Sequence, residues 1–212
     1  MAVGLLLVFV ATRYHNLAAL PVFFDEAESI RISKKAWTGP HNWFLGAHLN
    51  RLLYIWWVAI FWPFTGALWI SRAANLFVGL AGLAAILATG RLIGARGAGL
   101  LAVALYITVP VAFFFDRIVL GEHMQMAISA SLLFSTGVLL FHRRRWAVFV
   151  CGLLLTGYWL TKGTGFFWLG TPLLLLPTLP IRLWRSRLRW LAATYGVGAV
   201  SSLPFVLLLI RI

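Results

Sequence analysis

Long apolar runs separated by short basic segments are the sequence feature that most constrains how this chain can fold. Windows of about 20 apolar residues, the length of a helix that crosses a bilayer core, recur along the 212-residue sequence. These runs are continuous rather than alternating, which favours helices over a β-barrel. With 62% hydrophobic residues and a mean hydropathy of +0.92, the chain is too apolar for an ordinary soluble domain. The sequence therefore predicts an all-α, polytopic membrane protein.

The basic residues lie at the ends of the apolar runs and therefore indicate topology. A net charge of +13 would suggest nucleic acid as the partner of a soluble protein, but these positions predict membrane lipids and no nucleic-acid partner. Loops rich in arginine stay on the cytoplasmic side of a membrane. This rule marks three segments as cytoplasmic: Arg91 with Arg96, Arg143 to Arg145, and the group Arg182, Arg185, Arg187 and Arg189.

All acidic residues fall in two short clusters, Asp25, Glu26 and Glu28 in the first and Asp116 and Glu122 in the second. Acidic side chains are costly beside hydrocarbon and tend to be functional at helix ends that face a cavity. The alternative is that they only mark the water boundary. We take four of them as candidate catalytic residues that could activate a hydroxyl: Asp25, Glu26, Asp116 and Glu122.

No metal-site pattern accompanies these carboxylates, so we predict no protein metal site. Carboxylate oxygens would suit Mg²⁺ or Mn²⁺, which keeps a divalent cation as the one open cofactor. The five histidines and the one cysteine form no zinc motif.

Cations of the outer loops are the candidate substrate-binding residues. Arg117 and Lys162 lie in short outer loops, and Arg51 ends the long one. A phosphate would suit them, because arginine binds it through two N–H groups and lysine through a point charge. Arg51 could equally extend to lipid headgroups. His48 is a candidate of lower rank, because no second ligand at metal-binding spacing accompanies it.

We expect about seven crossings, at approximately residues 2–20, 73–90, 98–114, 123–141, 146–160, 165–180 and 191–210. The apolar run 52–64 is short, contains Pro63 and is rich in aromatic residues, which favour the membrane interface. We expect it to stay on the outer side as a shallow or re-entrant helix, because a further crossing would separate the two acidic clusters. Five glycines indicate close helix packing or turns rather than a nucleotide loop: Gly79, Gly82, Gly94, Gly97 and Gly99.

A short juxtamembrane helix is predicted over residues 25–37, in the first outer loop. Asp25 is its expected N-cap. Glu28 falls at helical spacing from Arg31 and Lys35, so we expect it to pair with one of them and to face water.

Four short motifs carry a resemblance to a known family. They are Phe24-Asp25-Glu26-Ala27, Arg72-Ala73-Ala74-Asn75, Asp116-Arg117 followed by Glu122, and Leu160-Thr161-Lys162-Gly163. With these motifs in this order, about residues 10–180 resemble the N-terminal part of membrane glycosyltransferases of the GT-C fold. The chain is similar to protein O-mannosyltransferases and to aminoarabinose-transferase-like bacterial enzymes, which are glycosyltransferase family 39-like.

The resemblance implies a bacterial inner-membrane enzyme with its active site on the extracytoplasmic side. Its donor would be a sugar linked to a polyprenyl phosphate, transferred with inversion to a hydroxyl of a lipid, glycan or protein. Asp25 would be the general base, with Glu26 beside it. Arg117 and Lys162 would hold the lipid phosphate, and Glu122 would occupy an acidic position of the family.

Residues 46–51, which read Gly-Ala-His-Leu-Asn-Arg, differ from the family's pattern, because relatives often have a Pro-Pro segment there. Relatives usually continue beyond seven spans, so we expect residues 1–212 to form one transmembrane module that is incomplete at its C-terminus.

Two alternative functions stay open. A secondary transporter or lipid flippase would use the acids as proton relays, although such proteins tend to place them near the bilayer midplane. The other alternative is an inactive scaffold fragment.

Overall fold

The computed structural model describes residues 1–49, 51–61 and 68–211, and of residues 46–49, 163–168 and 209–211 only the backbone. The described chain is helical and holds no strand, which confirms the all-α class. Pro63 of the predicted re-entrant run lies outside the described residues. The elements are α1 (Ala2–Tyr14), α2 (Phe24–Ala36), the 3-10 helix η1 (Pro40–Leu49), α3 (Leu52–Phe61), α4 (Leu68–Leu92), α5 (Arg96–Thr108), α6 (Pro110–Asp116), α7 (Gly121–His142), α8 (Trp146–Thr161), the 3-10 helix η3 (Gly163–Thr178) and α9 (Ile181–Arg211).

Three of the described helices are long and apolar enough to cross a membrane: Leu68–Leu92, Gly121–His142 and Ile181–Leu208. A fourth span results if α5 and α6 are counted as one, although they are bent by 74°. The other apolar helices are shorter. The structure thus agrees with a helical membrane protein, while seven full crossings stay a prediction.

The bend between α5 and α6 follows from the sequence Thr108-Val109-Pro110. A residue that precedes proline is disfavoured in the helical region, and Val109 accordingly has φ −71° and ψ 122°. Pro110 then fits the start of α6, where a backbone N–H donor is not needed. Helix α6 ends at Asp116, which is fully buried.

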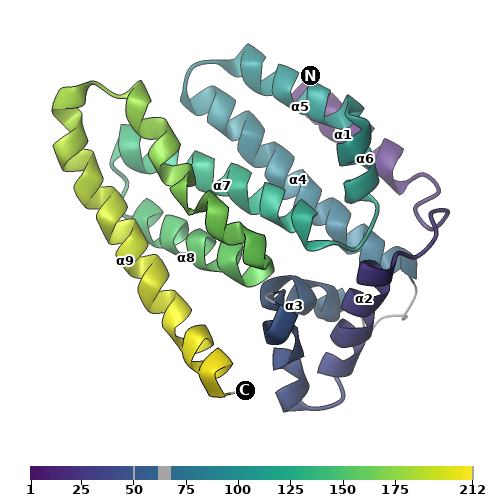
Figure 1. Cartoon of the computed structure of the whole chain (residues 1–212). Helices are drawn as coiled ribbons and strands as arrows, with labels where there is room; N and C mark the ends of the chain where they lie inside the picture. Colours follow the sequence, from purple (N-terminus) through teal and green to yellow (C-terminus); the bar gives the residue numbers. More distant parts are fainter. Residues whose placement is uncertain (50, 62–67, 212) are drawn as a thin grey trace.

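Helices α4 and α7 form the centre of the fold, with α1 and α5 on one side and α8, η3 and α9 on the other (Figure 1). Glycines on α4 permit this close packing. A Cβ atom at Gly82 would lie 3.0 Å from the Cα of Ala127, and one at Gly79 would lie 2.8 Å from Nε2 of His123. Gly94 instead adopts φ +76° in the turn after α4. At these three glycines, the prediction of packing and turn roles is confirmed.

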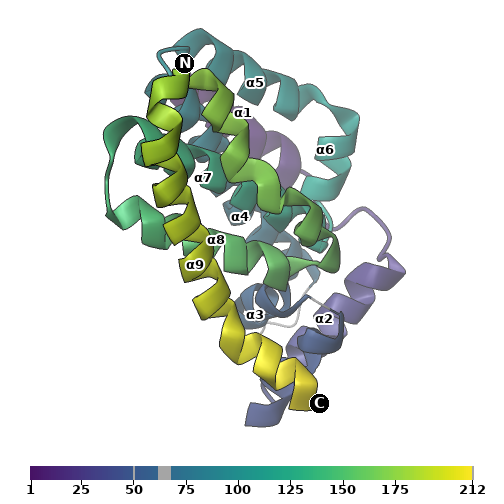
Figure 2. The same ribbon diagram turned by 60° about the vertical axis from the view of Figure 1, so that its left-hand side comes forward.

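Basic and acidic loops lie at opposite ends of the molecule in both ribbon views (Figures 1 and 2). What we call the basic end is formed by three turns, α4–α5, α7–α8 and η3–α9. The arginines of these turns and of the first turns of α9 are Arg91, Arg96, Arg143 to Arg145, Arg182, Arg185, Arg187 and Arg189. The other end, which we call the acidic end, holds α2, α3, the α6–α7 turn and the α8–η3 junction. The two acidic clusters meet there, since Val119 N–H donates to Glu26 over 3.0 Å.

The orientation of these two ends can be tested by cysteine labelling in a Cys151→Ala background, because Cys151 is buried. Lys35 on α2 and Arg144 in the basic end are both exposed and suit single-cysteine reporters. The positive-inside rule predicts that a membrane-impermeant thiol reagent labels Lys35→Cys in intact cells. Arg144→Cys should react only after permeabilisation. Labelling at position 144 but not at 35 in intact cells would reverse the orientation.

Candidate functional site

The first acidic cluster lies at the start of α2, whose N-cap is two residues earlier than predicted. The N-cap is Phe23 rather than Asp25, so that part of the prediction was wrong. The physical reason is Glu26, whose Oε2 accepts the free backbone N–H of Phe23 over 3.4 Å and thereby caps the helix. Asp25 lies within the first turn instead, where a negative charge is favourable.

Glu26 is fully buried and forms a two-pronged ion pair with Arg72 of α4. Arg72 Nε donates to Oε1 over 2.8 Å and Nη2 donates to Oε2 over 2.7 Å, and both side chains are 0% exposed. Oε1 also accepts the N–H of Val119. Glu26 therefore ties α2 to α4 and to the α6–α7 turn, and its oxygens are occupied.

The guanidinium of Arg72 also fixes the connection between α1 and α2. Nη1 donates to the carbonyl oxygens of Leu17 and Leu20 over 2.9 and 3.0 Å, and Nη2 donates to that of Pro21 over 3.2 Å. The carbonyl oxygens of a connection without regular structure need hydrogen-bond donors from elsewhere, because a buried carbonyl without a donor destabilises the folded state. The Arg72–Glu26 pair thus has a structural role at the acidic end.

Asp116 is the centre of a second buried network. Arg13 Nε donates to its Oδ2 over 3.0 Å, and the Tyr106 hydroxyl donates to its Oδ1 over 2.5 Å. His123 Nδ1 lies 2.8 Å from the same Oδ1, off the direction of a straight hydrogen bond. These partners come from α1, α5 and α7, so Asp116 joins three helices.

His123 contacts both Asp116 and α4 in this network. Its Nε2 lies 2.9 Å from the carbonyl oxygen of Asn75, which can only accept a hydrogen bond, so Nε2 is the donor of this contact. The pair is buried, with both side chains 0% exposed.

Arg117 lies just after α6 and is also engaged. Its Nη2 donates to the carbonyl oxygens of His15 and Asn16 over 2.9 and 2.5 Å. Burial, followed by the nearby charges of Arg72 and Arg13, lowers the pKa of Arg117. A phosphate would have to compete with these carbonyls for the same nitrogen, so the geometry favours a structural role for Arg117 over the predicted phosphate contact.

Asp25 remains accessible, unlike its neighbour Glu26. Its side chain is 60% exposed, and Oδ1 lies 3.7 Å from Nη2 of Arg51, which precedes α3 and is 20% exposed. Glu28, one turn further along α2, accepts two hydrogen bonds from Arg31 over 2.8 and 2.6 Å. They confirm the predicted pairing of Glu28 with Arg31 or Lys35, and they lower the pKa of Glu28. Asp25 is thus the accessible carboxylate beside a partly covered cation.

A second accessible pair lies close by. Lys162, which follows α8, binds the carboxylate of Glu122 in the first turn of α7. The two side chains are 27% and 37% exposed. Arg51 directly precedes α3, and a Cβ atom at Gly121, the residue before Glu122, would lie 4.0 Å from the ring of Tyr54 on α3. Both pairs therefore lie around the start of α3. The side chain of His48 lies outside the described part, so its predicted role is not tested.

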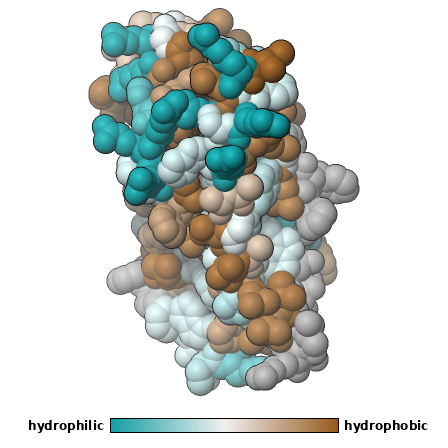
Figure 3. Space-filling view, turned by 90° about the vertical axis from the view of Figure 1, so that its left-hand side faces the viewer, coloured by the Kyte–Doolittle hydropathy of each residue, from teal (hydrophilic) through white to brown (hydrophobic). Residues whose placement is uncertain are grey.

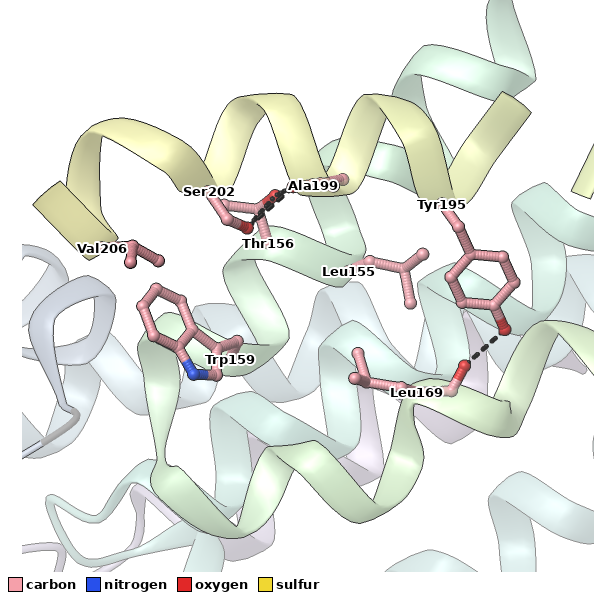
Figure 4. A pocket seen from close by; sticks show the side chains of 9 residues that line it. Leu155, Thr156, Trp159, Leu169, Tyr195, Ala199, Ser202 and Val206 are labelled. Atoms are coloured by element: carbon pink, nitrogen blue, oxygen red, sulfur yellow. Dashed lines mark hydrogen bonds between the residues drawn. The ribbon is translucent and has the colours of Figure 1, made fainter. Parts of the chain in front are cut away.

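An apolar cavity of about 520 Å³ lies between α8, η3 and α9. Trp159 and Val206 stand at one end of it, and Tyr195 donates a hydrogen bond to the carbonyl oxygen of Leu169 at the other (Figure 4). Trp159 lies three residues before Lys162 in the sequence. The cavity has the size and apolar lining of ligand pockets in proteins, which hold about 300–1,000 Å³.

The sequence analysis did not single out Arg13 or Tyr106, although both complete the buried network. The sequence feature that could have pointed to Arg13 is its position directly after an apolar run that is too short to cross a bilayer.

Among the described residues, no three His, Cys, Asp or Glu side chains converge as a metal site. No protein-family model, no curated protein and no solved structure matches this chain at a significant level.

Proposed function

We propose that this chain is the membrane module of a glycosyltransferase that takes a sugar from a polyprenyl-phosphate donor and passes it to a hydroxyl acceptor. The observation that carries the proposal is the contrast between two adjacent acids. Glu26 is buried and fully bonded, whereas Asp25 is 60% exposed at the start of α2 and has Arg51 as its ion-pair partner. An exposed carboxylate held at a helix start suits a general base.

The proposed reaction is an inverting substitution at the anomeric carbon of the donor sugar. Asp25 accepts the proton of the acceptor hydroxyl while the acceptor oxygen bonds to the sugar. The bond between the anomeric carbon and the phosphate oxygen breaks, and the lipid phosphate leaves with the electron pair. Lys162 and Arg51 stabilise the charge on that phosphate, because both are cations with partly exposed side chains at the acidic end.

The donor's lipid chain would occupy the cavity between α8, η3 and α9. This cavity is apolar, and Trp159 at one of its ends lies one helical turn before Lys162. A lipid phosphate at Lys162 could therefore extend its chain along α8 into the cavity. In this proposal the chain spans a bacterial inner membrane about seven times, and the acidic end faces the extracytoplasmic side.

A transporter or flippase is the second candidate, and one observation favours it. Asp116 and His123 lie 2.8 Å apart and fully buried inside the helical bundle, as neighbouring groups of a proton relay would. Arg13 and Tyr106 hold Asp116 in place, however, and a relay must release its proton during each cycle. The two functions differ in their products, because only a transferase yields a glycosylated acceptor in liposomes that contain donor and acceptor.

Donor binding tests the proposed role of Lys162. Lys162→Met keeps most of the side-chain length but removes the charge. Loss of a charge-assisted hydrogen bond costs about 1.5–3 kcal/mol, so the affinity for polyprenyl phosphate should fall by about tenfold to a hundredfold. The measurement is binding of polyprenyl phosphate to the purified protein in detergent.

Glu122→Gln is the matched variant for this experiment. It removes the carboxylate that Lys162 now binds and leaves the lysine free for phosphate, so affinity should stay the same or rise. Equal affinity in the parent protein and in Lys162→Met would refute the phosphate role. The same loss in both variants would point to disruption of the α7–α8 contact instead.

A further inference from the structure

The basic end carries positive charge that no side chain of the protein neutralises. Its arginines are Arg91, Arg96, Arg143, Arg144, Arg145, Arg182, Arg185, Arg187 and Arg189. Every acidic residue of the sequence belongs to α2, to α6 or to the first turn of α7, at the acidic end. Figure 3 shows the result on the face that carries α9, where hydrophilic side chains gather at the upper end. An external anion is needed to balance these charges.

Arg187 marks the place where that need is greatest. Its side chain is only 5% exposed, and its Nε has no hydrogen-bond partner among the described residues. The end of α7 and the first turns of α9 share one buried apolar cluster, which includes Leu139, Leu140 and Leu191, so Arg143 and Arg187 lie on adjacent elements. Like charges on adjacent elements with no carboxylate beside them favour an anion between them.

The fold keeps Arg143 in this place. Arg143 ends α7 in the left-handed conformation, with φ 53° and ψ 33°, and its N–H donates to the carbonyl oxygen of Leu139 over 3.2 Å. Such a conformation is uncommon for a residue other than glycine. It ends the helix and starts the short connection to α8.

The surroundings favour a phospholipid as the source of the anion. Only 17% of the apolar window of α9 is buried, so most of this window is exposed on the surface of the protein, where acyl chains can pack. Large apolar side chains near the start of α8 and α9 are exposed beside the arginines: Trp146 51%, Phe149 63%, Ile181 81% and Leu188 43%. Acyl chains can cover these side chains while the headgroup meets the guanidinium groups, which bind phosphate oxygens through paired N–H donors.

We propose that Arg187 and Arg143 bind the phosphate of an anionic phospholipid at the basic end. The lipid must carry a net negative charge, because a zwitterionic headgroup leaves the excess charge of the arginines in place. This site is separate from the acidic end and does not depend on the proposed glycosyl transfer.

Native mass spectrometry of the full chain, titrated with phosphatidylglycerol in detergent, tests this site. The parent protein should retain a phosphatidylglycerol molecule. Arg187→Gln and Arg143→Gln should each weaken its binding by about tenfold to a hundredfold, as expected for a lost charge-assisted hydrogen bond. Arg145→Gln is the matched control, because Arg145 is exposed in the same connection. It should weaken binding by no more than about fivefold, the effect of one surface charge on an anionic lipid.

Several outcomes would overturn the proposal. Equal weakening in all three variants would assign the binding to diffuse attraction, and no weakening in any would remove the site. Equal affinity for phosphatidylcholine would show that net charge is irrelevant. Displacement of the lipid by inorganic phosphate at similar concentration would assign the site to a free phosphate ion. If Arg187→Gln fails to fold, Arg143→Gln decides the question, because Arg143 is exposed.

Discussion

Asp25→Asn should lower the turnover of sugar transfer by about 10²- to 10⁴-fold and leave donor binding nearly unchanged. The amide has the shape of the carboxylate and can still accept a hydrogen bond, but it cannot take the proton of the acceptor hydroxyl. The side chain of Asp25 is 60% exposed, and its ion-pair contact within the described part of the chain is Nη2 of Arg51, 3.7 Å away. The backbone oxygen of Asp25 accepts a hydrogen bond from Ser29, which the substitution leaves in place. The substitution therefore removes basicity without loss of structure.

Sugar transfer in reconstituted liposomes measures this effect, with donor binding measured in parallel for each variant. Glu28→Gln is the control on the same helix. Glu28 is held by two hydrogen bonds from Arg31, so this variant should turn over like the parent. If Asp25→Asn keeps the parent's turnover while Glu122→Gln abolishes transfer, the base belongs to the second acidic cluster and the first only marks the water boundary.

Arg72→Met should destabilise the protein by about 3–5 kcal/mol, because it leaves the carboxylate of Glu26 buried without its counter-ion. Both side chains are 0% exposed and share two hydrogen bonds, of 2.8 and 2.7 Å. The substitution also leaves the carbonyl oxygens of Leu17, Leu20 and Pro21 without their donor. The expected result is loss of the ordered connection between α1 and α2.

Unfolding in detergent by sodium dodecyl sulfate or by heat measures this loss. Arg31→Met is the matched control, since it breaks the exposed pair with Glu28 and should leave the unfolding midpoint unchanged. The double variant Glu26→Gln/Arg72→Met should recover part of the loss, because it removes the buried unpaired charge. If Arg72→Met unfolds at the parent's midpoint, the buried pair does not stabilise the acidic end.

Helical structure and the separation of charge could be predicted from the sequence, whereas the break at Pro110 lies inside the single crossing that we expected over residues 98–114. Continuous apolar runs leave helices as the structure that satisfies their backbone groups in lipid. Pro110 ends α5 by a local steric effect, and the spacing of Glu28 and Arg31 predicts a pair on one helix face. These features depend on neighbours within a few residues, so the order of the amino acids is sufficient to determine them.

Tertiary structure alone decided which acids stay accessible. Asp25 and Glu26 are adjacent and chemically alike, but one residue turns a helix by about 100°, so they face different surroundings. Glu26 meets Arg72, 46 residues away in the sequence, and Asp116 meets Arg13, 103 residues away. Local patterns carry no information on such distant partners. The packing of α1, α2, α4 and α7 buries Glu26 and Asp116 and leaves Asp25 exposed. Buried charges need partners of opposite charge, and here only this packing supplies them.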